Sequence, residues 1–438
     1  MEENNFVQQQ RFQASQTNSY MNRQPAYPML ISIVAALGGL LFGFDFAIFS
    51  GTIPFLQPHF GLSDAELGFT SSSIYIGCIA GSLSTGYLAD RFGRKMPLIA
   101  SAVIFAISAV AMGLASTNAN LIIARVVAGA AVGAASMLSP LYIAEICPAH
   151  IRGRMVSVNQ LAIVVGILLA YVSSYLLADQ TNNWRWMFAS AALPATIFFV
   201  SALFLPESPR WLQQRGQTKS NTEKSSLAAL VKPGMLLIVG VGVTVAVFQQ
   251  ISGANVVFVY APIIFAKAGM DVSNQLFQQV LIGLVNLVFT LLSMRLVDKI
   301  GRRSLLLIGS IGMSIMLAAI AGAFYFNLLQ GPLVTILVLI LIAIYATTLA
   351  PVTWVLIAEI FPNAIRGVAV SVATTALWVA CFGVVYLFPV LTSYFGDKAY
   401  YNFLVFAFIC LVYFLFILKY VPETKGKTLE EIEAKLLA

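Results

Sequence analysis

The sequence predicts an all-α membrane protein with twelve transmembrane helices in two six-helix halves, related by a parallel pseudo-two-fold repeat. Three observations carry this prediction: the composition, the spacing of the charged residues and an internal repeat. Of the 438 residues, 59% are hydrophobic and 10% are charged, whereas a soluble protein has about 25% charged residues. A chain this apolar belongs in a lipid bilayer.

The charged residues divide the chain into apolar blocks, and a block needs about 20 residues to span a bilayer. The 55-residue charge-free block 304–358 predicts two spans, with the turn NLLQGP at 327–332 between them. Another span surrounds Asp45, and Arg125 interrupts a further one. The remaining charge-free blocks complete a count of twelve spans, six before residue 210 and six after 233: 67–89, 96–124, 126–144, 155–178, 186–206, 233–266, 272–294, 367–396 and 399–418.

The basic residues predict the orientation, because Lys and Arg gather in cytoplasmic loops. With both termini in the cytoplasm, all but four of the 25 Lys and Arg residues fall on the cytoplasmic side. The net charge of +7 therefore reflects topology, and no nucleic-acid binding is expected. The predicted outer loops contain no N-x-[ST] sequon, which fits the inner membrane of a bacterial cell. The four exceptions are Arg125 within the membrane and Arg185, Lys267 and Lys398 outside.

The same pattern predicts five segments along the chain. The two six-helix halves are separated by a short cytoplasmic linker, and each end carries a tail. The first tail is rich in Gln and Asn, which indicates disorder. The expected bounds are a disordered cytoplasmic tail at 1–27, the first half at 28–210, the linker at 211–232, the second half at 233–420 and the cytoplasmic C-terminal tail at 421–438.

Three motifs occur twice, and the two copies of each are six predicted spans apart. LADRFGRK at 88–95 matches LVDKIGRR at 296–303, YIAEICPAHIRGR at 142–154 matches LIAEIFPNAIRGV at 356–368, and PESPR at 206–210 has a weaker echo in PETKG at 422–426. An even number of spans gives both halves the same orientation. Parallel six-span repeats are a transporter architecture, with the substrate at the midplane between the halves. A channel or a membrane enzyme gives no reason for such a duplication.

The repeated motifs place charges on the cytoplasmic side of each half. Acids and arginines at the ends of mobile helices can pair across the halves and hold this side shut. The alternative is that they only cap helices and fix topology, but the completeness of both copies favours a gate. The predicted gate charges are Asp90, Arg94, Glu145, Arg152, Glu207, Asp298, Arg302, Glu359 and Arg366.

Nine strings in this order resemble the sugar porters of the major facilitator superfamily, a family with bacterial sugar–proton symporters and mammalian facilitative glucose transporters. The resemblance implies a transporter that works by alternating access, not an enzyme. It implies no cofactor and no metal, and it names as partners a monosaccharide, a proton and the lipid bilayer, with the chain acting as a monomer. The strings are GGLLFGFDFAIFSG, GYLADRFGRK, YIAEICPAHIRGR, NWRWMF, PESPRWL, QQISGANVVFVYAP, VDKIGRR, PVTWVLIAEIFPNAIRG and PETKGKTLEEIE, between residues 38 and 432.

A sugar site needs amides, which donate and accept hydrogen bonds, and an aromatic plane for the sugar's C–H faces. Polar residues around Gly253 predict a broken helix that lines a cavity, and Pro351 can break a second one. For a single amide we would favour interhelical packing, but three amides within seven residues favour a site. In the family resembled, the matching positions contact the sugar, which gives Gln160, Gln249, Gln250, Asn255, Asn286 and Trp354, with Trp378 as a further candidate.

Three positions near this site depart from the bacterial xylose–proton symporters of this family. Ile167 and Leu377 stand where glutamines are found, and Ala350 stands where many members have glycine. Losing amides leaves room for apolar contact, so a hexose is expected rather than a pentose. Val259 replaces one of two adjacent tyrosines that help to close the outer gate in relatives, which leaves Tyr260 as the expected gate residue.

Asp45 and Arg125 are the two ionisable side chains predicted to lie well inside the spans, so they should pair there. If the pair forms in one state and breaks in the other, proton binding to Asp45 is tied to conformation. Proton symporters of the family have an acid at the position that matches Asp45, and facilitative members do not. The alternative is a permanent salt bridge that carries no proton.

The linker is much shorter than in most sugar porters and has room for one short helix, near Glu223 to Val231. The function predicted is proton-coupled uptake of a sugar. The alternatives are a facilitative sugar uniporter, a carrier of a related polyol such as inositol and, least favoured because both tails are short, a sugar sensor. The four cysteines form no C-x-x-C pair and are expected to pack rather than to bind a metal or form disulfides.

Overall fold

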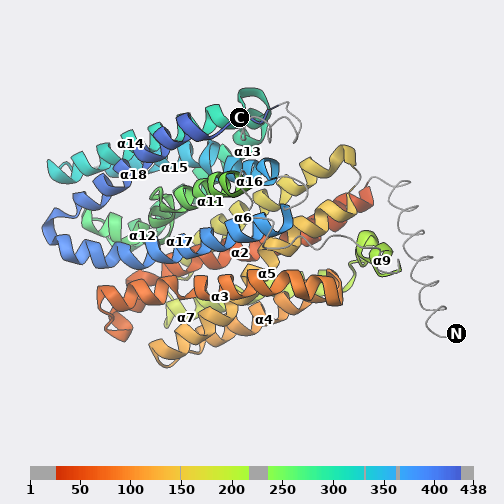
Figure 1. Ribbon diagram of the computed structural model, residues 1–438. Helices are drawn as coiled ribbons and strands as arrows, with labels where there is room; N and C mark the ends of the chain where they lie inside the picture. The colour runs from red at the N-terminus through yellow and green to blue at the C-terminus, as the bar shows by residue number, and fades with distance from the viewer. Residues whose placement is uncertain (1–25, 148, 217–234, 330–331, 362–365, 426–438) are drawn as a thin grey trace.

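The computed structural model describes residues 26–147, 149–216, 235–329, 332–361 and 366–425, and these form two helical halves (Figure 1). The first half consists of α2 (Ala26–Phe60), α3 (Asp64–Phe92), α4 (Lys95–Gly113), α5 (Asn118–Ile146), α6 (Ala149–Leu177) and a sixth span made by α7 (Asn183–Ser190) and α8 (Ala192–Leu203). A short helix, α9 (Pro209–Gly216), follows.

The second half repeats this arrangement with two broken spans. It consists of α11 (Met235–Ile251) with α12 (Ala254–Lys267), α13 (Val272–Ile300), α14 (Arg302–Tyr325), α15 (Leu333–Thr347) with α16 (Leu349–Ile360), α17 (Arg366–Phe395), the 3₁₀ turn η1 (Gly396–Lys398) and α18 (Tyr400–Tyr420). The turn predicted at 327–332 lies between α14 and α15. The predicted all-α architecture of twelve spans is therefore confirmed.

In the described part of the chain, eleven spans are long and apolar enough to cross a membrane, and α3 is the twelfth. It is the most polar span because it carries the run Thr70–Ser73 on its buried surface. Hydroxyls in this run donate back to the helix, as Ser71 Oγ does to the Leu67 carbonyl at 2.6 Å. Because these hydroxyls have hydrogen-bond partners, the polar run can lie inside the bilayer.

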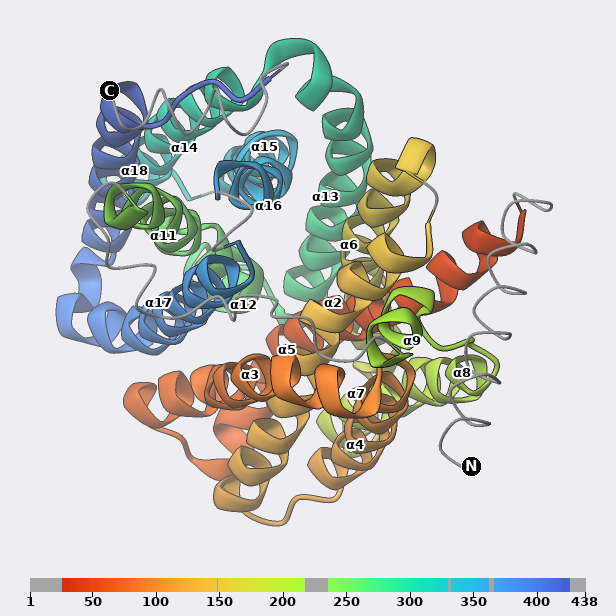
Figure 2. The same cartoon turned by 45° about the vertical axis from the view of Figure 1, so that its right-hand side comes forward.

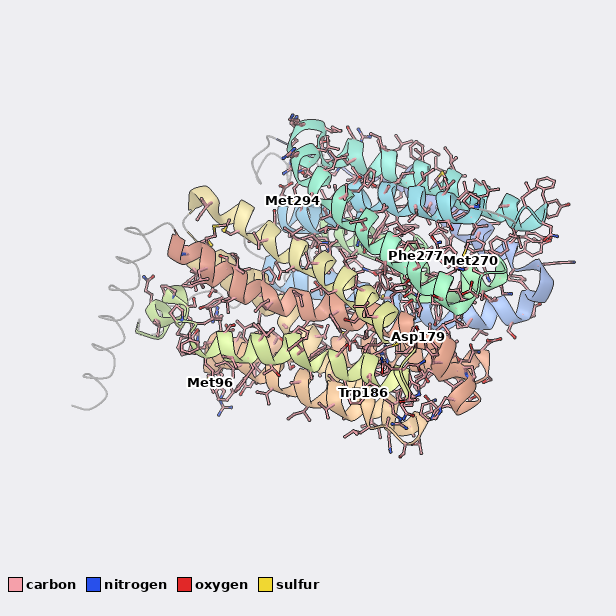
Figure 3. All side chains as sticks on the ribbon, turned by 180° about the vertical axis from the view of Figure 1, so that it is seen from behind. Met96, Asp179, Trp186, Met270, Phe277 and Met294 are labelled. Atoms are coloured by element: carbon pink, nitrogen blue, oxygen red, sulfur yellow. The ribbon has the colours of Figure 1, made fainter. Side chains whose placement is uncertain are left out.

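The two ends of the bundle differ in charge. Figure 3 shows Met96 and Met294 toward one end and Asp179, Trp186, Met270 and Phe277 toward the other. We call the first the basic end, where α4 begins at Lys95 and α14 at Arg302. The second is the far end, which includes Gly61 and Leu114.

The halves meet mainly along three pairs of helices: α2 with α12, α3 with α17, and α6 with α13. Figure 2 shows α6 and α13 side by side between the two halves. Within the first half, Gly129 and Gly133 let α5 approach α3 closely, since a Cβ at Gly129 would lie 2.0 Å from the Ile74 carbonyl oxygen. This G-x-x-x-G pair therefore serves helix packing.

Both predicted helix breaks are present. Gly253 has a φ of 91° and separates α11 from α12, a conformation that glycine adopts without strain. The second break is at Thr348, three residues before Pro351. Proline lacks an N–H and removes the bond to the carbonyl four residues earlier, which here is that of Thr347. The Ser293 hydroxyl donates to this carbonyl at 2.8 Å instead.

The expected division between residues 210 and 211 falls inside α9, because Pro209 occupies the first helical position and the Ser208 hydroxyl accepts from the Trp211 N–H at 3.3 Å. The linker helix expected at 223–231 and the tails at 1–25 and 426–438 lie outside the described residues. All four cysteines are free and buried.

Candidate functional site

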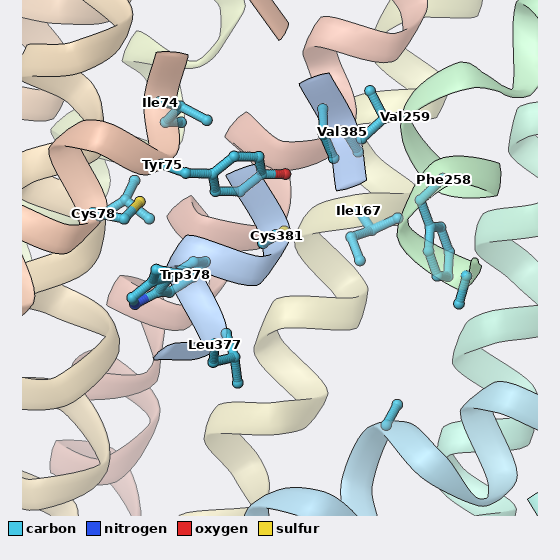
Figure 4. Close-up of a cluster of buried hydrophobic side chains, with 14 of the residues drawn as sticks. Ile74, Tyr75, Cys78, Ile167, Phe258, Val259, Leu377, Trp378, Cys381 and Val385 are labelled. Atoms are coloured by element: carbon cyan, nitrogen blue, oxygen red, sulfur yellow. The ribbon is translucent and has the colours of Figure 1, made fainter. Parts of the chain in front are cut away.

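A cavity of about 80 Å³ lies between the two halves, near the middle of the bundle. Its wall combines α2, α3 and α6 of the first half with α11, α12, α13, α15, α16 and α17 of the second. Figure 4 shows part of it, with Tyr75, Trp378 and Cys381 on one side and Ile167 and Phe258 on the other. The structure brings all seven predicted substrate residues together on this wall: Gln160, Gln249, Gln250, Asn255, Asn286, Trp354 and Trp378.

Three buried amides form a directed chain of hydrogen bonds at the α11–α12 break. Asn255 Nδ2 donates to Gln250 Oε1, Gln250 Nε2 donates to Gln249 Oε1 at 2.5 Å, and Gln249 Nε2 donates to the Tyr345 hydroxyl at 2.6 Å. The turn at Gly253 makes this chain possible because it brings Asn255 back onto Gln250. Amides arranged in this way can exchange their mutual bonds for bonds to a ligand that both donates and accepts.

Aromatic rings form the rest of the wall. Trp378 lies edge-on to Phe42 at 5.5 Å and is stacked with Tyr75 at 6.0 Å, while Phe46 meets Phe258 across the halves at 6.2 Å. Trp378 is 2% exposed, and its Nε1 has no hydrogen-bond partner among the described residues. A buried donor without a partner is costly, so this indole N–H needs a partner that none of the described residues supplies in this conformation.

The sequence missed several residues of this wall. Their apolar or aromatic character made them look like ordinary span residues, and only Tyr345 had a detectable signal, a hydroxyl within a very apolar span. The three positions noted as departures, Ile167, Ala350 and Leu377, do line the cavity. The missed residues are Phe42, Gly43, Phe46, Tyr75, Ile163, Val164, Phe258, Tyr345 and Cys381.

Asp45 and Arg125 are both buried in the first half, at 0% and 2% exposure, but the expected direct ion pair between them is not formed in this structure. Arg125 Nε and Nη2 donate to the Thr70 and Ser71 carbonyls of α3, each at 3.0 Å. Its guanidinium also lies 4.0 Å from the centroid of the Phe49 ring. These contacts hold Arg125 on α3 and leave both Asp45 carboxyl oxygens without a hydrogen bond from any described residue.

The gate charges form a cluster at the basic end of the first half. Arg94 Nη2 pairs with Glu145 Oε1 at 2.9 Å, and the Arg94 backbone N–H donates to Glu207 Oε1 at 2.8 Å. The Ser208 hydroxyl donates to the other Glu145 oxygen at 2.5 Å. Asp90 is 80% exposed and contributes a longer pair with Arg94 at 3.7 Å. The cluster ties α4, α5 and the segment before α9 together.

The second half has the same cluster. Arg302 Nη2 pairs with Glu359 Oε1 at 3.0 Å, the Arg302 N–H donates to Glu423 Oε1 at 2.9 Å, and the Thr424 hydroxyl donates to Glu359 Oε2 at 2.6 Å. The weak echo PETKG is therefore a true copy of PESPR, and Glu423 is a charge that the sequence prediction left out.

Neither Arg94–Glu145 nor Arg302–Glu359 crosses between the halves, so the expected cross-half pairing is not formed by these residues here. Each arginine instead meets the acid of its own repeat, since the D-x-x-G-R turn points its side chain at the adjacent helix. Three other predicted gate residues have side chains outside the described set: Arg152, Asp298 and Arg366.

Tyr260, the predicted outer-gate residue, is fully buried. Its hydroxyl donates to the Val385 carbonyl of α17 at 2.7 Å, and its ring stacks on Phe388 at 5.2 Å. Both contacts lie within the second half, beyond the cavity toward the far end. Tyr260 therefore packs α12 against α17 at the place where α17 meets α3.

Comparison with known proteins gives full-length matches. The profile of a family described as "Sugar (and other) transporter" matches residues 31–232 and 218–436. A D-xylose–proton symporter of Escherichia coli strain K12 is 40% identical over 479 aligned positions, which cover 94% of this chain and 97% of the relative. An arabinose–proton symporter of Bacillus subtilis strain 168 is 38% identical over 442 positions, covering 93% of this chain and 94% of the relative.

Solved structures match as well. The xylose transporter of E. coli in a partially occluded inward-open conformation superposes with a TM-score of 0.81 at 38% identity, covering 92% of this chain and 100% of that one.

Proposed function

This chain belongs to the sugar transporter family, and on that premise we propose that it carries a monosaccharide across the membrane together with a proton, by alternating access. The observation that carries the proposal is the cavity between the halves, whose wall combines a chain of buried amides with the ring of Trp378. Sugar hydroxyls can replace the amide-to-amide bonds, and the rings offer planes for the C–H faces.

The proton has a separate place, at Asp45. An ionised carboxylate buried without a partner costs several kcal/mol or more, so the conformation described here favours Asp45 as a neutral acid. Release of the proton then requires Arg125 to leave the Thr70 and Ser71 carbonyls and approach Asp45, or water to enter. Because Arg125 is held by α3, which packs on α17 of the other half, movement of the halves can control this step.

The side of the membrane follows from charge. We place the basic end and both termini in the cytoplasm of a bacterial inner membrane, with the chain acting as a monomer. The far end then faces outside, and Tyr260 is a residue of the outer gate. The clusters around Arg94 and Arg302 lie at the cytoplasmic gate.

The substrate class that fits best is a hexose. Ile167, Ala350 and Leu377 make part of the cavity wall apolar, which suits a larger sugar better than a set of additional amides would. The cavity lining, not the names of the relatives, supports this choice.

Uptake by purified protein in proteoliposomes tests the function. Sugars and polyols, including glucose, galactose, xylose, arabinose and inositol, are presented with and without an inward pH gradient. The proposal expects accumulation of a hexose above its external concentration, which a protonophore abolishes. Equilibration of sugar that is indifferent to the gradient would identify a uniporter, and uptake restricted to inositol would identify a polyol carrier.

A further inference from the structure

A buried hydrogen bond joins the two halves on the far-end side of the cavity. The Tyr171 hydroxyl of α6 donates to the Phe258 carbonyl of α12 at 2.8 Å, and the Tyr171 side chain is fully buried. Gly283 of α13 makes room for the ring, since a Cβ there would lie 3.1 Å from Tyr171 Cδ2. The bond therefore sits where three helices from both halves meet.

The Phe258 carbonyl needs this partner because residue 262 is a proline. The missing N–H of Pro262 would have bonded the carbonyl four residues before it. Within the second half, a hydroxyl takes the place of a missing proline N–H as the donor to a carbonyl at two more sites. Three prolines of broken or bent spans thus free three carbonyls, and each accepts from another helix: Phe258 from Tyr171, Thr347 from Ser293 and Val385 from Tyr260.

Of these three bonds, the one made by Tyr171 crosses between the halves, so it alone must break when they part. We propose that Tyr171 is a gating residue, whose bond to the proline-freed Phe258 carbonyl latches the outer side shut. The inference rests on the alternating access proposed above. When the outer side opens, water reaches both groups. When it closes, the carbonyl is buried and accepts from Tyr171.

A second buried hydrogen bond crosses the boundary between the halves. Gln279 Nε2 of α13 donates to the Ser50 hydroxyl of α2 at 3.2 Å, with both residues fully buried. This bond is longer than the Tyr171 bond, and Gln279 Oε1 has no partner among the described residues. The Gln279 bond therefore holds the halves together less firmly. Removing the Tyr171 hydroxyl should therefore shift the equilibrium even while Gln279 stays in place.

The test measures the opening of the outer side directly. Cysteines replace Leu114 and Phe326, which are 75% and 69% exposed at the far ends of α4 and α14, one in each half. Nitroxide labels on them report the distance by pulsed electron paramagnetic resonance, and the four native cysteines are buried and should label poorly. Tyr171→Phe keeps the ring and removes only the hydroxyl. An unsatisfied buried carbonyl should raise the ratio of outer-open to outer-closed molecules by about 5- to 150-fold.

Two control variants separate the latch from general loss of stability. Ser293→Ala breaks an equivalent bond to a proline-freed carbonyl inside the second half and should leave the distance distribution unchanged. Tyr175 lies one turn further along α6, where its partly exposed ring contacts Phe277. Tyr175→Phe removes its hydroxyl and should also leave the distance distribution unchanged. An unshifted distribution in Tyr171→Phe, or an equal shift in Ser293→Ala, would overturn the latch.

The distance measurement separates failure of the latch from failure of the proposed transport. If unsubstituted protein shows a single distance under every sugar and pH condition and Tyr171→Phe shows it too, the latch is wrong. If distances change with sugar or pH in unsubstituted protein but not further in Tyr171→Phe, alternating access stands and the latch alone fails. Failure of proton-driven uptake together with a shift in Tyr171→Phe would overturn the proposed coupling and leave the latch in place.

Discussion

Arg125 and Asp45 lie buried in the same half of the protein, yet Arg125 binds the Thr70 and Ser71 carbonyls and Asp45 has no hydrogen-bond partner among the described residues. A permanent salt bridge between them is therefore not what this conformation contains. The acid can therefore change its protonation state when the arginine moves.

Asp45→Asn should abolish accumulation of sugar driven by a pH gradient while leaving sugar exchange between the two sides intact, because the amide cannot take up a proton but is neutral like the protonated acid. Proteoliposome uptake and counterflow measure the two activities. Glu66→Gln, an exposed acid in the first turn of α3, is the matched control and should keep both. Accumulation against a gradient by Asp45→Asn would refute coupling at this residue.

Gln250→Ala should raise the KM for sugar by about 5- to 150-fold, since one or two hydrogen bonds worth about 1–3 kcal/mol are lost from the site. The amide chain runs through Gln250, so its removal also frees Asn255 and Gln249 from their present partners. Gln180→Ala, at an exposed turn, should leave the KM unchanged. An unaltered KM in Gln250→Ala would show that the amides serve only to pack the helices.

Ile167→Gln should change sugar preference rather than overall activity. The substitution exchanges an apolar part of the cavity wall for an amide, and one hydrogen bond contributes about 0.5–1.5 kcal/mol net. The ratio of kcat/KM for xylose to that for glucose is expected to rise by about tenfold. Both sugars are measured on the same preparation, so the ratio is its own control. A ratio that falls or stays constant would contradict the proposed hexose preference.

Glu145→Gln should lower the melting temperature more than Glu359→Gln does, although the two acids are equivalent in the repeat. The Glu145 side chain is 3% exposed and its partner Arg94 7%, so the substitution removes the close, buried charge partner of the guanidinium and leaves the longer pair with exposed Asp90. Breaking a buried pair lowers the free energy of unfolding by about 3–5 kcal/mol, which is the upper bound here. Glu359 is 33% exposed and water can compensate. The melting temperatures of the detergent-solubilised variants test this order. Asp90→Asn, at 80% exposure, is expected to change the melting temperature least. Equal losses for Glu145 and Glu359 would mean that burial does not set their contributions.

The fold could be predicted closely because its main constraint acts locally. A backbone in hydrocarbon must satisfy its own hydrogen bonds, so apolar runs of the right length imply helices and their number implies the topology. The breaks near Gly253 and Pro351 were visible for the same reason: glycine and proline change the backbone wherever they stand. The exact position of the second break, at Thr348, could not be predicted, since a proline disturbs the turn before it.

The sequence by itself determined the twelve spans, the repeat and the residue types of the site, because each depends on composition, spacing or backbone chemistry within a short segment. Tertiary structure alone decided which partners these residues have. It placed Arg125 on the carbonyls of α3 instead of on Asp45, kept Arg94 and Arg302 within their own halves, and joined Tyr171 to the Phe258 carbonyl. Such choices depend on the relative position of helices far apart in the chain, and in a low-dielectric interior a few ångströms decide which donor meets which acceptor.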